Sequence, residues 1–120
     1  MDDDQSAEAV LAELAIDSWR FARDYGKVIL KLDANEQPRF ANKLHYYLQR
    51  LQSSLEQVGM KIVNLENQRF EVGMAADVLN GDEFSKDDVL VVDQMLEPVI
   101  IGLQGIVMRT GKIMVRKAMQ

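Results

Sequence analysis

Hydrophobic residues in the first third of the chain recur at alternating intervals of three and four. One such row runs between Ser6 and Leu32, with Ser18 as its polar member, and consists of Leu11, Leu14, Phe21, Tyr25, Val28 and Leu32. This spacing predicts a long amphipathic helix. A second row, made of Ala15, Trp19, Ala22, Gly26 and Ile29, runs beside the first. The apolar face is therefore wider than a two-stranded coiled coil requires, and it suits a helix bundle.

A helix break and a second helix follow. Pro38 disfavours helix at the residue before it and suits the first turn of a new helix, so residues 33–38 separate the two helices. The second helix is predicted from about Pro38 to Val58, because Gly59 is a natural C-terminal stop. Its apolar face comprises Phe40, Leu44, Tyr47, Leu48, Leu51, Leu55 and Val58.

Two helices joined as a hairpin would leave wide apolar faces uncovered. A second copy of the chain could cover them, so a homodimeric four-helix bundle is the economical arrangement, with a heteromeric helix bundle as the alternative. The expected dimerisation contacts are Leu11, Leu14, Phe21, Tyr25, Leu44, Leu48, Leu51 and Leu55.

After Gly59 the hydrophobic period changes to two, and β-branched residues and glycine become frequent. In the last predicted strand, Ile113 and Val115 fall on one face and the basic residues mainly on the other. The predicted fold is α+β, with a helical dimerisation or docking region over residues 1–59 and a small, mainly antiparallel β domain over 60–120. Strands are expected at residues 61–65, 69–72, 89–92, 99–101, 106–108 and 112–116.

Composition and charge exclude several classes of protein. The 120 residues include no Cys, which excludes thiolate zinc sites, thiol catalysis and disulfides. The net charge is -5, and the basic residues after Glu97 lack interleaved aromatic side chains, so nucleic acid is not expected as a partner.

No apolar run approaches the roughly 18 residues of a membrane span, and the acidic start Met1–Asp4 differs from a secretory signal. We therefore expect a cytoplasmic protein.

No group of residues has catalytic spacing. His45 is the single histidine, and it lies in a predicted helix with no second His or Cys to share a metal. The acidic residues around Gly81 lack the regular alternation and the terminal bidentate Glu of a calcium site. We expect a non-enzymatic protein, without cofactor or metal, that acts by presenting a protein-binding surface.

The order of parts and the motifs of the β half resemble the GrpE family of nucleotide exchange factors. The similar motifs are Gly59–Val63, the sequence Phe70-Glu71-Val72, the segment 74–78 and the terminal segment Gly105–Lys117. The resemblance implies a co-chaperone whose β domain grips the ATPase domain of an Hsp70-class chaperone and holds its nucleotide cleft open, which lowers nucleotide affinity. It further implies partner contacts at Phe70, Glu71, Met74, Arg109 and Lys112.

The alternative is an adaptor or assembly subunit of a larger bacterial complex that uses a GrpE-like fold without exchange activity. Three positions favour it: Val72 and Thr110 stand where the family has proline, and Ala75 stands where it has histidine. In this hypothesis the helical half dimerises or docks onto the larger assembly.

Overall fold

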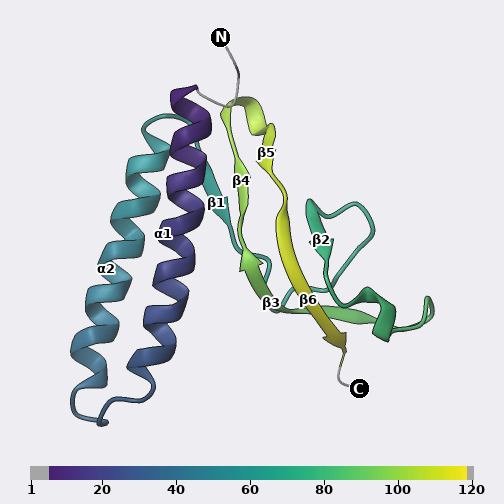
Figure 1. The fold of residues 1–120 in the computed structure, drawn as a ribbon, viewed down its shortest axis with the longest axis horizontal. Coiled ribbons are helices and arrows are strands. Elements are labelled where there is room, and N and C mark those ends of the chain that lie inside the picture. Colours follow the sequence, from purple (N-terminus) through teal and green to yellow (C-terminus); the bar gives the residue numbers. More distant parts are fainter. Residues whose placement is uncertain (1–5, 119–120) are drawn as a thin grey trace. The chain divides into compact units, whose positions relative to one another are not determined.

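The chain is α+β, as the sequence predicts, with two helices followed by small antiparallel and mixed sheets (Figure 1). The computed structural model describes residues 6–118, so the acidic start Met1–Asp4 lies outside the described residues. The chain divides into two compact units, one up to Lys61 and the other from Ile62. Within the described part, neither helix is long and apolar enough to span a bilayer.

Helix α1 (Ala7–Ile29) ends three residues before the predicted Leu32. Ser6 caps its N-terminus, because the Ser6 Oγ accepts a hydrogen bond from the Ala9 N–H at 3.0 Å and satisfies one of the donors that a helix start leaves free. Lys27 in the last turn carries the charge that the negative end of the helix dipole favours. The capping and the dipole thus fix both ends of the predicted amphipathic segment.

Helix α2 (Gln37–Glu56) begins with Pro38 in its first turn, as predicted. The Gln37 side chain donates to the Leu32 carbonyl at 2.9 Å and so closes the turn between the helices. The helix ends before the predicted Val58, and the chain reverses through Gly59 at a φ of 75°.

The two helices pack through the small members of the second row of α1, which are Ala15, Ala22 and Gly26. A Cβ built on Gly26 would lie 3.5 Å from Leu44 Cδ2, and Ala15 and Ala22 of the same row are buried. Small side chains let the helix backbones approach closely, so this row forms the interior of the hairpin.

The strands form two three-stranded sheets. Their bounds are β1 Lys61–Val63, β2 Ala76–Val78, β3 Leu90–Glu97, β4 Val99–Ile101, β5 Val107–Arg109 and β6 Gly111–Lys117. One sheet has the order β1-β4-β5 and the other β2-β6-β3. In the second sheet β6 is central, antiparallel to β3 and parallel to β2, so the predicted mainly antiparallel β domain contains one parallel pair.

Strand β6 separates a buried face from an exposed one. Ile113 and Val115 are buried and lie opposite Met95 and Val92 of β3, which are also fully buried, while Lys112 is exposed. The predicted assignment of Ile113 and Val115 to one face is therefore confirmed. Full burial of each such side chain stabilises the fold by about 1.5–3 kcal/mol.

The prediction of a strand at residues 69–72 is wrong. Arg69 makes a single isolated bridge with β3, and the chain then turns, with the Met74 N–H donating to the Glu71 carbonyl at 3.2 Å. Gly73 in this turn has a φ of 103°, a conformation that a strand does not contain and that glycine adopts without a steric penalty.

After β2 the chain forms a short 3-10 segment, Gly81–Glu83, and the residue before it, Asn80, is hydrogen-bonded to the central strand. The Asn80 side-chain amide donates to the Val115 carbonyl, and its oxygen accepts from the Val115 N–H, each at 2.9 Å. A side chain thus continues the hydrogen bonding of the sheet after β2 ends.

Val92→Ala should lower the free energy of unfolding by about 2 kcal/mol, because it removes methyl groups from a fully buried position and leaves a cavity. Val72→Ala is the matched control, since Val72 is 99% exposed and the same change there should alter stability by less than about 0.5 kcal/mol. Urea unfolding followed by circular dichroism measures both. Equal effects would contradict the assigned core.

Gly26→Ala should stabilise the hairpin by about 0.5–1 kcal/mol, because the new Cβ meets Leu44 at van der Waals distance and alanine favours the helix. Gly26→Leu should instead destabilise it by about 1–3 kcal/mol, because a large side chain overpacks the helix interface. Thermal unfolding of the helical signal distinguishes the two. A Leu variant as stable as the Ala variant would show that the helices do not pack through this row.

Candidate functional site

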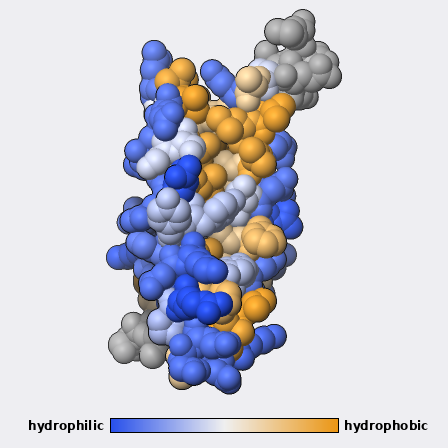
Figure 2. All heavy atoms as spheres, turned by 90° about the vertical axis from the view of Figure 1, so that its left-hand side faces the viewer, coloured by the Kyte–Doolittle hydropathy of each residue, from blue (hydrophilic) through white to orange (hydrophobic). Residues whose placement is uncertain are grey.

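One face of the helical hairpin exposes the first apolar row of α1. Leu14 and Phe21 keep 58% and 69% of their surface exposed, and Val28 continues the row. On α2, the aromatic rings of Tyr46 and Tyr47 are exposed as well. Figure 2 shows an apolar strip that runs along the hairpin between hydrophilic side chains. Contiguous exposed apolar surface of this kind marks interaction sites.

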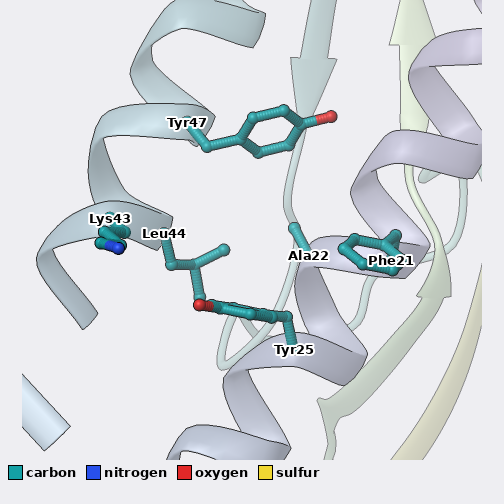
Figure 3. Close-up of a pocket in the computed structure, with 6 residues that line it drawn as sticks. All are labelled: Phe21, Ala22, Tyr25, Lys43, Leu44 and Tyr47. Atoms are coloured by element: carbon teal, nitrogen blue, oxygen red, sulfur yellow. The ribbon is translucent and has the colours of Figure 1, made fainter. Parts of the chain in front are cut away.

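The same face is hollowed in two places. The smaller hollow, of about 250 Å³, is lined by Phe21, Ala22, Tyr25, Lys43, Leu44 and Tyr47 (Figure 3). In the close-up, Leu44 and Tyr47 project from α2 towards α1, and the ring of Tyr25 extends from α1 towards Leu44. The larger hollow, of about 500 Å³, is lined from Leu11 to Ser18 on α1 and from Tyr46 to Leu55 on α2. We call the exposed row and these two hollows the hairpin groove.

Most of the expected dimerisation residues line the hairpin groove. Leu48 lies outside both hollows, whereas the others line one of them. Leu14 and Phe21 are exposed, and Leu55 is almost fully buried within the hairpin. The remaining ones are half-buried: Leu11, Tyr25, Leu44 and Leu51. The structure thus gathers the predicted residues on one face, with Leu14 and Phe21 as its most accessible large side chains.

The α2 edge of the hairpin groove is basic. Residues 37–55 include no acidic side chain, while Arg39, Lys43 and Arg50 are exposed. Lys43 and Arg50 line the two hollows, and Lys43 Nζ lies 5.4 Å from the ring centre of Phe40, within cation–π range. The positive charges therefore border the apolar face directly.

The α1 edge of the hairpin groove carries charges of both signs, because the exposed Arg20 lies between Asp17 and Asp24 on the same side of the helix. Asp17 and Asp24 lie four residues before and three residues after Phe21, so helical geometry places both beside the exposed row. They stand on the side of α1 opposite the small residues that meet α2. Both are exposed, and neither forms an ion pair with any residue between 6 and 118. The α1 edge therefore has no single sign of charge, in contrast to the basic α2 edge.

The expected contacts Phe70 and Glu71 lie around the turn that replaces the predicted strand. Phe70 is half-buried and lines a hollow of about 610 Å³ together with Val72 and the loop 85–90. The Phe70 N–H donates to the Leu90 carbonyl at 2.8 Å, which fixes the entrance to the turn. Glu71 and Val72 are exposed.

The other expected contacts lie elsewhere in the β unit. Arg109 ends β5 in the first sheet, whereas Lys112 lies on β6 in the second sheet and pairs with Glu97 at 3.6 Å. The Gly111 N–H donates to the Ala75 carbonyl at 2.8 Å. The segment that follows Met74 therefore runs beside the start of β6. The structure therefore distributes the five predicted contacts over a turn and two sheets.

His45 is exposed on α2. Among residues 6–118, no group of three or more histidine or carboxylate side chains is placed to hold a metal ion.

No protein-family model matches the sequence, and searches of curated proteins and of solved structures return no significant match. The function is therefore argued from the surfaces that the two units present.

Proposed function

We propose that this chain is a non-enzymatic protein-binding factor, an adaptor or assembly subunit that docks through the hairpin groove. The observation that carries the proposal is the exposed apolar row over two hollows, in which Leu14 and Phe21 are both more than half exposed. Removing such apolar surface from water is favourable by about 25 cal/mol per Å², from which the cost of association is subtracted. The apolar surface thus supplies a driving force for association.

The shape and composition of the hairpin groove suit a helical occupant. Two helices with an apolar groove between them correspond to one half of a four-helix bundle, and a second pair of helices would complete it. The rings of Phe21, Tyr25, Tyr46 and Tyr47 border the groove, and aromatic side chains are enriched at the centres of protein interfaces. An amphipathic helix pair with an apolar face would fill both hollows.

Exchange activity on an Hsp70-class ATPase is a second hypothesis, and it concerns the β unit. The GrpE-like motifs support it, as does the turn after Phe70, where Val72 is 99% exposed and offers an apolar contact. Under this hypothesis Phe70, Glu71, Met74, Arg109 and Lys112 bind the ATPase domain. Docking through the hairpin groove is compatible with either activity.

Leu14→Asp should weaken docking through the hairpin groove by at least about 30-fold, because the complex would bury an unpaired charge. The hairpin itself should stay folded, since Leu14 is exposed. Crosslinked pull-down from the source cells, read by mass spectrometry, and sedimentation of the purified chain measure the loss. Leu30→Asp is the control, because Leu30 is 75% exposed and lies outside both hollows. Unchanged capture and sedimentation for Leu14→Asp would refute the proposal.

The exchange hypothesis has its own measurement. The rate of ADP release from any recovered Hsp70-class ATPase should rise when the wild-type chain is added. The Val72→Asp variant should not raise this rate, and it should still fold, because Val72 is 99% exposed. If the wild-type chain does not change the rate of ADP release, the exchange hypothesis is refuted and the adaptor hypothesis is the one that stands.

A further inference from the structure

We infer that the hairpin groove receives a helix of another protein, and that this helix is acidic along the side that faces α2. The inference rests on the proposed docking role of the groove, and it adds the chemical class and the placement of the occupant. Its basis is a row of cations on the rim of α2 for which residues 6–118 supply no carboxylate partner.

The cations form one row along α2. Arg39, Lys43 and Arg50 are spaced by four and seven residues, and Tyr46 takes the remaining place, so the helical period puts all four on one side. Lys43 lines the smaller hollow, and Tyr46 and Arg50 line the larger one. The row therefore forms the α2 rim of the groove, and no acidic residue interrupts it, because residues 37–55 contain none.

Neighbouring aromatic rings hold these cations at the rim. The Arg39 guanidinium lies 4.9 Å from the ring centre of Phe40, which Lys43 also approaches. The Arg50 guanidinium lies 5.8 Å from the ring centre of Tyr46, and its Nη1 donates to the Tyr46 hydroxyl at 3.4 Å. A ring contact positions a cation without neutralising it. The three cations thus keep their charge beside apolar surface, where it attracts carboxylates.

The α1 rim differs from the α2 rim. Its most exposed large side chains are the apolar Leu14 and Phe21, and beyond them Asp17, Arg20 and Asp24 carry charges of both signs. An occupant that fits both rims therefore needs apolar side chains towards α1 and carboxylates towards α2. An amphipathic helix with Asp or Glu along one border of its apolar stripe has this pattern, and such helices bind in apolar grooves of other proteins.

The groove also sets the length of the occupant and the spacing of its carboxylates. The lining of α1 extends from Leu11 to Tyr25, which is about 21 Å at 1.5 Å per residue, or about four helical turns. Lys43 and Arg50 stand about 10 Å apart along α2. Carboxylates seven residues apart on a helix that runs along α2 therefore meet both cations.

Two other occupants match these features less well. A second copy would bring either the same cations of α2 or the mixed charges of α1, so no uniformly acidic side would meet the basic row. An anionic membrane surface would attract the cations, but amphipathic helices lie in the plane of such a surface and insert an apolar face into it. Here the apolar side chains instead line hollows between two helices, which the side chains of a third helix can fill.

A synthetic peptide tests the class of the occupant. The probe is an amphipathic helix of about six turns, with leucine along one stripe and glutamate along one border of it, and its counterpart has lysine at every glutamate position. At low salt, fluorescence anisotropy should show that the wild-type chain binds the glutamate peptide at least tenfold more tightly than the lysine peptide. This preference should shrink as salt is added, because the charges lie at an exposed rim.

Charge reversal on the rim tests the placement. A variant with both Lys43→Glu and Arg50→Glu should prefer the lysine peptide, and this reversed preference excludes misfolding as the cause. A variant with both Lys31→Glu and Lys61→Glu is the matched control, because it changes the net charge equally at exposed lysines outside both hollows. The control should keep the preference of the wild type.

The remaining outcomes would overturn the inference. Equal binding of both peptides, binding of neither, or a rim variant with the wild-type preference would show that the basic row does not select the occupant. A wild-type chain that sediments with vesicles of equal parts phosphatidylcholine and phosphatidylglycerol, and binds neither peptide, would assign the cations to a membrane. A wild-type chain whose self-association excludes the glutamate peptide would assign the groove to a second copy.

The proposed function fails separately. If Leu14→Asp abolishes capture from the source cells while the rim variant captures as much as the wild type, the docking role stands and the acidic partner is wrong. If neither variant changes capture, the docking role fails together with the inference.

Discussion

The helical unit depends on a mismatch between the width of the apolar face of α1 and the width that one neighbouring helix can cover. The small-residue row packs against α2, where Leu44 comes within van der Waals distance of a Cβ at Gly26. This close packing leaves the other row, with Leu14 and Phe21, exposed on the open face. A single helix covers one stripe of its neighbour, so two adjacent apolar rows require a further element. The hairpin groove follows from that requirement.

The same packing determines where the charges can act. Once the small residues face α2, the mixed charges of Asp17, Arg20 and Asp24 stand on the outer side of α1, and Lys43 and Arg50 border the groove on α2. The helical unit therefore exposes an apolar face that basic side chains border on α2. The β unit has a smaller exposed apolar surface, around the turn after Phe70.

The periodicity of hydrophobic residues predicted the helices and the last strand. It did not predict features that depend on contacts between segments far apart in the sequence. The helices begin and end within a few residues of the predicted limits, and β6 buries Ile113 and Val115 as expected, because both predictions rest on side-chain spacing. Residues 69–72 have the composition of a strand, yet Gly73 adopts a positive φ and turns the chain after one bridge. The basic edge of the groove was not predicted, because the charges on α2 look like ordinary solvated residues until the two helices are placed side by side.

The sequence by itself determined that the first helix has two adjacent apolar rows, that a second helix follows a break at Pro38, and that a β unit with a two-faced last strand comes after them. It could not determine which row of α1 meets α2, because both have helical spacing and both are apolar. Tertiary packing decided this. The row with Ala15, Ala22 and Gly26 permits close approach of the backbones, and the row with Leu14 and Phe21 is too bulky to do so. The larger side chains are therefore the ones that stay exposed.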